Sequence, residues 1–500
     1  MANPIPVMEP EARQLQTIGN SVAGVLRSLL GDSAHYLAGV VVVGLANMVL
    51  LPIYTRYLIL SDLGLYALIE VLALASISLS SLGFNVAYLK WFAESTPREV
   101  PELLGTMMWV NGLAGAFTGT ALWLFLSSNR STLMLHGNAR RFAWLLLPLI
   151  LLEALQEVLL THLRAQRRPG AFSIASAIRV VSIAAFSIWL VASRGQGLTG
   201  VFQARVLGDL CGCLVMCGLT APDLSRSASL RFALLMAKYG FPVMASSLIM
   251  MILDGAGRFF LNHYGDLEQV GRYAVAIKIS AVMRMLIVAP FGAAWGGIMF
   301  QMAKRSDAPA IFSKIMSYLM VLSISLTLVF SLFSPFLLLV LATKQYSASL
   351  PLIPWLLLVQ AAAVLQYPCS TGIFLGSATK WLLPIFSFGV AITFLLNRLL
   401  IPRFGSFGAA WAWLVAWVVI NTLMAGIGRR YYPQRYEKKP LLLALALCGL
   451  VLVTSHPRPW TTWFSGIIVP SVSSIIIMLL VIGYVWTDLR RSAASMRTAE

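Results

Sequence analysis

Apolar runs of about 20 residues, separated by short polar or Pro/Gly breaks, follow one another along most of the chain, and each is long enough to cross a bilayer as a helix. The first six lie at 33–57, 63–89, 104–127, 142–163, 171–192 and 198–219. Six more lie at 238–262, 270–300, 311–341, 350–374, 378–400 and 407–427, and a last pair at 440–456 and 465–487. This pattern predicts an all-α polytopic membrane protein with about 14 transmembrane helices.

The two series of six spans share short motifs, so the chain looks duplicated. Arg56-Tyr57-Leu58 followed by Gly64-Leu65-Tyr66-Ala67 returns as Arg258-Phe259-Phe260 followed by Gly271-Arg272-Tyr273-Ala274. Gly197-Leu198-Thr199-Gly200 returns as Gly405-Ser406-Phe407-Gly408. Two six-span units have the same orientation, so an axis along the membrane normal should relate them. Transporters built this way hold their substrate between the repeats.

The repeat divides the chain into predicted segments. These are an interfacial amphipathic segment at 1–32, an N-lobe at 33–219, a cytoplasmic linker at 220–237, a C-lobe at 238–427, a basic loop with a helix pair at 428–487, and a cytoplasmic tail at 488–500. Apolar side chains in the first segment recur every three or four positions, which favours a helix lying along the membrane surface. The alternative is a frayed leader whose periodicity is accidental.

Composition supports a membrane protein: 59% of the residues are hydrophobic and 11% are charged. The net charge of +18 would suit a nucleic-acid partner, but the Lys and Arg residues are scattered between apolar runs. We therefore predict that the protein has no nucleic-acid partner. With the N-terminus in the cytoplasm, most of the 37 Lys and Arg residues fall in cytoplasmic loops, so the charge bias predicts an N-in and C-in topology.

Motifs for catalysis or for a cofactor are not found in the sequence. The five cysteines and five histidines show no metal-ligand or disulfide spacing, and no GxxxxGK[ST], GxSxG or HExxH occurs. The predicted loops are short, which argues against a soluble catalytic domain. We expect no enzymatic activity and no cofactor. The enzymatic alternative is a polytopic glycosyltransferase or polysaccharide polymerase, which would be expected to carry a long outer loop with catalytic groups.

Charged side chains inside spans are costly and mark function or pairing. They are Glu70, Glu153, Glu157, Arg179, Arg205 and Asp209 in the first lobe, and Asp254, Arg258, Lys278 and Arg284 in the second. The second set holds three cations against one carboxylate. Such a surplus needs an anionic partner, and a phosphate or diphosphate suits guanidinium groups.

Glu153 and Glu157 are spaced i, i+4 on one predicted span, so their like charges repel and favour protonation of one of them. They would then bind a proton or a sodium ion. The alternative is pairing with Arg179 or Arg164 on a neighbouring helix.

Arg205 and Asp209 have the same spacing with opposite charges, which predicts an intrahelical structural pair. Glu70 is the one charged residue in its predicted span. Two roles are open for it: a carboxylate switch, or the counter-ion of Arg56. Together with Asp254, the three glutamates of the first lobe are the candidates for ion coupling or gating.

Several stretches resemble a known family. They are Leu51-Pro52-Ile53-Tyr54-Thr55-Arg56-Tyr57-Leu58 through Asp62-Leu63-Gly64-Leu65-Tyr66-Ala67, then Ser80-Ser81-Leu82-Gly83-Phe84-Asn85, Leu163-Arg164-Ala165-Gln166-Arg167-Arg168 and Gly197-Leu198-Thr199-Gly200. They are similar to Wzx-type polysaccharide flippases of the multidrug/oligosaccharidyl-lipid/polysaccharide exporter superfamily. The likeness covers most of the first lobe and is stronger for the superfamily than for a substrate.

The resemblance implies two six-helix lobes that open alternately to each side of the bacterial cytoplasmic (inner) membrane. The implied substrate is a polyprenyl-diphosphate-linked glycan whose tail stays in membrane lipid, with a polysaccharide polymerase and glycosyltransferases as partner enzymes. Basic cavity residues would hold the diphosphate, and the candidates are Arg56, Arg258, Lys278 and Arg284. The departure is that acids and bases inside the spans are equal in number. The rival is a multidrug or cation antiporter of the same superfamily, in which Glu70, Glu153, Glu157 and Asp254 would dominate.

Overall fold

The computed structural model describes residues 49–432, except Arg167, Arg226, Lys304 and Ser306, together with Cys448, Gly449 and Gly483. Throughout this part of the chain the regular structure is helical, and 11 helical segments are long and apolar enough to cross a membrane. They coincide with the second to twelfth predicted spans, which confirms the all-α polytopic fold class. Residues 49–57 are the helical end of the first predicted span. Segment 1–32 and the last two spans lie outside the described residues, so the total of 14 stays a prediction.

The helices up to residue 220 form one bundle, here called the N-bundle. Its helices are α3 (Leu60–Ser81), α4 (Phe84–Glu94), α5 (Val100–Ser127), α6 (Asn129–Leu135), α7 (Leu146–Ala165), α8 (Pro169–Ser187) and α9 (Gly197–Thr220). α3 and α4 cover one predicted span, broken at Leu82 and Gly83. Both residues have positive φ values, 48° and 71°, and the glycine adopts this left-handed conformation without a Cβ penalty.

The remaining helices form the C-bundle. They are α10 (Leu230–Tyr264), α11 (Leu267–Met283), α12 (Ala289–Met302), α13 (Ala308–Leu341), α14 (Ile353–Val364), α15 (Gln366–Leu375), α16 (Leu382–Phe404) and α17 (Ser406–Tyr431). Between α11 and α12 the span continues as a five-residue π-helix, η4 (Arg284–Val288). Such π-segments are rare and occur frequently at functional sites.

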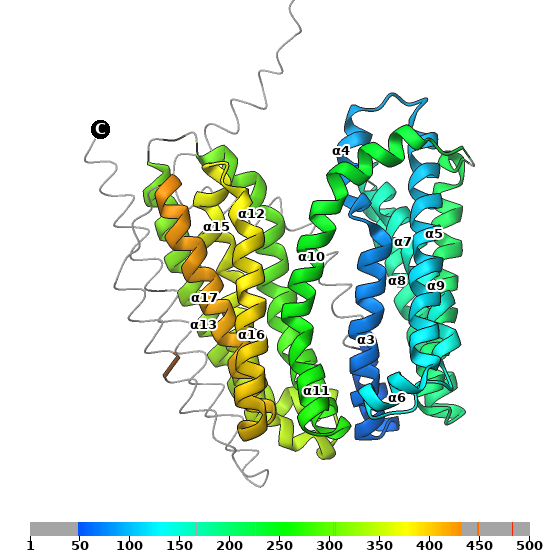
Figure 1. The fold of residues 1–500 in the computed structure, drawn as a ribbon, viewed down its shortest axis with the longest axis vertical. Coiled ribbons are helices and arrows are strands. Elements are labelled where there is room, and N and C mark those ends of the chain that lie inside the picture. Colours follow the sequence, from blue (N-terminus) through cyan, green and yellow to red (C-terminus); the bar gives the residue numbers. More distant parts are fainter. Residues whose placement is uncertain are drawn as a thin grey trace, which may run out of the picture.

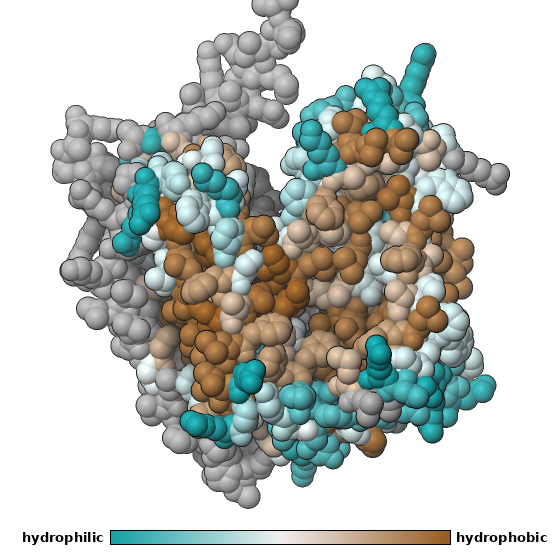
Figure 2. Space-filling view, viewed as in Figure 1, coloured by the Kyte–Doolittle hydropathy of each residue, from teal (hydrophilic) through white to brown (hydrophobic). Residues whose placement is uncertain are grey.

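The two bundles stand side by side and are separated at the upper end of Figure 1, while they meet at the lower end. Figure 2 shows a notch between them at the top and an apolar belt between polar ends, as a membrane-spanning protein requires. α10 contacts the N-bundle on the upper side. Its Gly240 lies so close to Gly83 that a methyl group built on Gly240 would overlap the Gly83 backbone.

The lower contact is made by the repeated glycines. A methyl group built on Gly64 of α3 would overlap the Leu267 carbonyl and lie 3.2 Å from the Gly271 nitrogen. One built on Gly271 of α11 would overlap the Leu60 carbonyl and lie 3.2 Å from the Gly64 nitrogen. Glycine at both positions lets the two helix backbones approach this closely. The duplicated motif thus supplies the lower contact between the two bundles.

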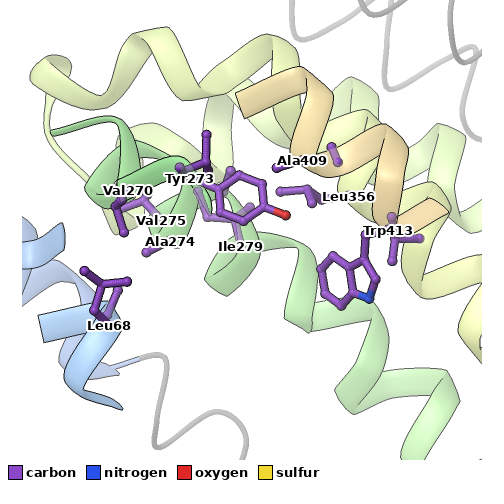
Figure 3. Close-up of a cluster of buried hydrophobic side chains, with 14 of the residues drawn as sticks. Leu68, Val270, Tyr273, Ala274, Val275, Ile279, Leu356, Ala409 and Trp413 are labelled. Atoms are coloured by element: carbon purple, nitrogen blue, oxygen red, sulfur yellow. The ribbon is translucent and has the colours of Figure 1, made fainter. Parts of the chain in front are cut away.

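The core beside this contact is apolar. Figure 3 shows Tyr273 of α11 directed toward Leu356 of α14 and Ala409 of α17, with Leu68 of α3 on the other side of α11. Each of these side chains is at most 2% exposed. α11 is therefore held in the C-bundle by one face while its glycine face contacts the N-bundle.

Candidate functional site

A polar cavity of about 510 Å³ lies where α3, α7, α8 and α9 of the N-bundle face α11. Its charged lining residues are Glu70, Glu153, Glu157, Arg164, Arg179, Arg205 and Lys278. Cavities of this size hold small ligands or parts of larger ones. Six of the ten charged residues predicted inside the spans line this cavity, five from the N-bundle and Lys278 from the C-bundle; Asp209, Asp254, Arg258 and Arg284 do not.

Four charged groups of the N-bundle form a closed ion network, here called the N-network. Arg179 Nε donates to Asp209 Oδ1 at 2.6 Å, and its Nη2 donates to Glu153 Oε1 at 3.1 Å. Arg205 Nη2 donates to the same Glu153 oxygen at 2.6 Å. Asp209 is fully buried and Glu153 is 9% exposed. Two cations therefore balance two carboxylates within the bundle.

The N-network corrects the pairing predicted from sequence. Arg205 and Asp209 were expected to pair along one helix, but each pairs with another helix, α7 or α8. For Glu153 the structure bears out the alternative from the sequence, which is pairing with Arg179 on the neighbouring helix. Glu157 is half-buried and accepts a hydrogen bond from Asn85 Nδ2 at 3.2 Å.

Glu70 pairs across the two bundles. Lys278 Nζ of α11 lies 3.0 Å from Glu70 Oε1 of α3, and Tyr66 Oη donates to the same oxygen at 3.2 Å. Arg258 and Arg205 also lie within electrostatic range of Glu70. One carboxylate at the boundary between the bundles thus contacts one cation directly and lies within electrostatic range of two more. This group, Glu70 with Lys278, Arg258 and Arg205, is here called the boundary cluster.

Arg258 has an incomplete set of partners. Its Nη1 donates to the Ala67 carbonyl across the bundle boundary at 3.4 Å, and its Nε is buried without a hydrogen-bond partner among the described residues. The i, i+4 neighbour Asp254 is paired elsewhere. An unpartnered guanidinium N–H in a buried setting is costly, and an anion arriving there would be a favourable partner.

Asp254 and Arg284 form an ion pair within the C-bundle. Two guanidinium nitrogens of Arg284 lie 3.2 Å from Asp254 Oδ2, and Trp413 Nε1 donates to Oδ1 at 3.2 Å. Arg284 Nε donates to Gln360 Oε1 at 3.1 Å. The Arg284 side chain is 45% exposed and opens the π-helix η4, so one face of this cation remains accessible.

Arg56 does not lie with the other candidate residues around the cavity. It is exposed at the lower end of the molecule, on the helix that precedes α3, and does not line the cavity. Sequence reasoning also missed residues that line it, among them Tyr54 and Gln156. Gln156 Nε2 donates to the Asp209 carbonyl at 2.5 Å. Its position one turn after Glu153 was the signal that could have placed it in the same group.

The sequence matches the family model described as polysaccharide biosynthesis protein over residues 29–303, more than half of the chain. The chain belongs to this family. The resemblance to polysaccharide flippases is therefore confirmed, and the matched region covers the N-bundle, α10, α11 and α12. No sequence among the curated proteins matches the chain.

Solved structures of transporters share the fold. An inward-facing multidrug resistance MATE family transporter of the MOP superfamily is 17% identical, with a TM-score of 0.60, over 80% of this chain and 95% of that one. The lipid II flippase MurJ, in an inward closed conformation, is 13% identical, with a TM-score of 0.57, over 92% and 99%. A mutant of the Vibrio cholerae MATE transporter VcmN is 13% identical, with a TM-score of 0.56, over 82% and 98%. Family and fold together make the chain a multi-pass membrane protein of the flippase and transporter superfamily.

Proposed function

We propose that this family member flips a polyprenyl-diphosphate-linked glycan across the bacterial inner membrane by alternating access. Residues 33–219 and 238–427 would move as two lobes, with the N- and C-termini and the open upper end facing the cytoplasm. A glycosyltransferase would supply the substrate, and a polymerase would consume it on the other side. The protein would need no cofactor and form no covalent product.

The boundary cluster carries this proposal. Glu70 occupies a place among Lys278, Arg258 and Arg205 that a diphosphate fits better, because phosphate oxygens accept several charge-assisted hydrogen bonds at once. The substrate would displace Glu70 on entry, and Glu70 would recover its cations on release. The cluster lies where the two bundles meet, so binding there bears on both of them.

The antiporter alternative rests on the same acids, and their pairing weighs against it. Glu153 is held by two arginines, Glu70 by Lys278 and Asp254 by Arg284. A cationic drug would have to displace an attached cation at each of these three carboxylates. The arrangement favours an anionic substrate.

Proteoliposomes loaded with a labelled polyprenyl-diphosphate glycan test the proposal. Wild-type protein should relocate the label without changing the glycan length, and Lys278→Ala with Arg258→Ala should slow relocation at least about 10-fold, equivalent to about 1.4 kcal/mol. Transport of a cationic drug that survives Lys278→Ala and is lost in Glu70→Gln would instead establish the antiporter. A longer or shorter glycan product would establish an enzyme.

A further inference from the structure

A second, smaller cavity of about 240 Å³ continues the first one toward the upper end. The two cavities share Leu74, Ile77 and Glu157 in their linings. The smaller one is enclosed by the last turns of α3, the start of α4, α7 and the exposed middle of α10. Its polar lining residues are Ser78, Ser81, Asn85, Glu157 and Ser247, and no Lys or Arg is among its described lining residues. We call it the upper chamber.

Donors in the upper chamber are largely used by the protein itself. Ser81 Oγ donates to the Ser78 carbonyl at 2.8 Å, and Ser247 Oγ donates to the Val243 carbonyl at 3.0 Å. Asn85 Nδ2 donates to Glu157 Oε1 at 3.2 Å. A hydroxyl that has donated its proton still has lone pairs, and an ionised carboxylate accepts at both oxygens. Ser81 Oγ and Asn85 Oδ1 already accept from Gly83 N and Val86 N, so what the chamber offers a ligand is above all the carboxylate of Glu157.

A ligand that fits such a lining must bring donors. Sugar hydroxyl groups and the N–H of an acetamido group are donors of this kind. A uronic acid carries an ionised carboxylate, which only accepts, and it would meet the negative charge of Glu157 with no described cation in the lining to offset it. The chamber should accept neutral or N-acetylated sugars and reject acidic ones.

We propose that the upper chamber is the subsite for the sugars next to the diphosphate, and that Glu157 selects neutral or N-acetylated sugars against uronic acids. The proposal rests on the flippase function proposed above and names the class of glycan. The diphosphate would lie at Glu70, Lys278 and Arg205, the members of the boundary cluster that line the larger cavity, and the adjoining sugars would extend past Glu157 toward the upper end. The charge of the larger cavity and the acceptors of the smaller one would then recognise successive parts of one molecule.

Competition between two labelled substrates in proteoliposomes tests this subsite. Both carry the same polyprenyl diphosphate, one with an N-acetylhexosamine and one with a hexuronic acid as the first sugar. Wild-type protein should prefer the first by about 10-fold or more in kcat/KM, and Glu157→Gln should narrow the preference to about 2-fold. Equal rates for both substrates in wild type, or an unchanged preference in Glu157→Gln, would overturn the subsite and leave the flippase function standing. Relocation of neither substrate would overturn the flippase function itself.

A matched pair of serines on α10 gives a second test that does not depend on charge. Ser246 and Ser247 each donate to a carbonyl of the preceding turn at 3.0 Å, but only Ser247 lines the chamber. Ser247→Ala removes one acceptor and should raise KM for the N-acetylated substrate about 2- to 10-fold, the range of one hydrogen bond. Ser246→Ala should leave it unchanged. An equal effect of the two substitutions would contradict the proposal, because it would reflect the helix and not the chamber.

Discussion

The intramembrane charges are paired differently in the two bundles. In the N-bundle, Glu153, Arg179, Arg205 and Asp209 form a closed network between α7, α8 and α9, and its carboxylates are buried. Each charge of this network has a partner in the same bundle. This arrangement holds three helices together, and of its four charges Arg205 also lies within electrostatic range of Glu70 in the boundary cluster.

The C-bundle leaves its charges more open. Asp254 pairs with Arg284, and Lys278 pairs with a carboxylate of the other bundle. Arg258 has one buried N–H that no group in the described part of the chain accepts. Arg284 is 45% exposed and Lys278 31%. The difference teaches that composition is a poor guide to function inside a membrane. Charges that close on themselves are structural, and charges left incomplete point to a ligand or to movement.

The largest expected effect comes from opening the N-network. Arg179→Met leaves Asp209, which is fully buried, without its cation, so we expect the free energy of unfolding to fall by about 3–5 kcal/mol. The unfolding midpoint in detergent micelles measures this change. Arg164→Met is the matched control on the exposed rim of the same cavity and should stay within about 0.5 kcal/mol of wild type. Similar midpoints for the two variants would mean that the network is not structural.

The second-largest effect concerns the glycine contact, to which the two bundles contribute equivalent residues. Gly64→Ala and Gly271→Ala each place a methyl group against the backbone of the other bundle, so each should cost about 1–3 kcal/mol or force the lower contact apart. Unfolding midpoints and labelling of a cysteine at the exposed Tyr57 position by a membrane-impermeant reagent follow the two outcomes. Gly218→Ala, where a methyl group meets nothing within 4 Å, is the control. A strong effect at one glycine and none at the other would refute the symmetric contact.

The third effect contrasts one arginine from each bundle. Arg284→Gln should lower glycan relocation about 10-fold, or about 1.4 kcal/mol, with little change in the unfolding midpoint, because the side chain is half-exposed and Asp254 keeps its Trp413 donor. Arg205→Gln should lower the midpoint, since Glu153 loses its 2.6 Å partner. If both variants lost stability to the same extent, the distinction between closed and open charges would fail.

The smallest effect concerns two loop carboxylates outside the spans. Arg305 donates to Asp307 at 2.8 Å and lowers its pKa, and in the N-bundle the backbone N–H and hydroxyl of Thr96 lower the pKa of Glu99. A lowered pKa in the folded state adds stability above the ordinary pKa, which is lost as the pH falls through the folded value. Asp307→Asn should therefore cost at most about 1 kcal/mol near neutral pH. Unfolding midpoints between about pH 3 and pH 7 should converge for variant and wild type at the acid end; a constant gap would contradict the assignment.

The sequence predicted the spans well because apolar length and polar breaks are local properties. It also identified each charge of the two clusters. It failed on the partner of Arg205: Asp209 is four residues away along the chain, whereas the partner in space, Glu153, is on α7. Which face of one helix meets another depends on tilt and rotation, and the spacing along a single helix does not contain them.

The repeat also contains a signal for the pairing of Glu70 with Lys278. When Gly64 is superimposed on Gly271, Glu70 and Lys278 are one position apart in the two copies. Each charge follows the contacting glycine of its own helix by about two turns, so the glycine contact and the Glu70–Lys278 pair are neighbours. Arg56 and Arg258 belong to the same motif but only Arg258 lies at the boundary, which the repeat alone could not decide.

The glycine contact also bears on the history of the molecule. If the two halves descend from one six-helix ancestor, that ancestor associated with a second copy through an isologous interface, with the same glycine contributed by both subunits. In a homodimer, a position on the axis faces its own copy, so the two sides of the boundary could not differ there. Fusion into one chain released the copies from identity. It allowed the two halves to diverge at the boundary, where Glu70 of one half now contacts Lys278 of the other.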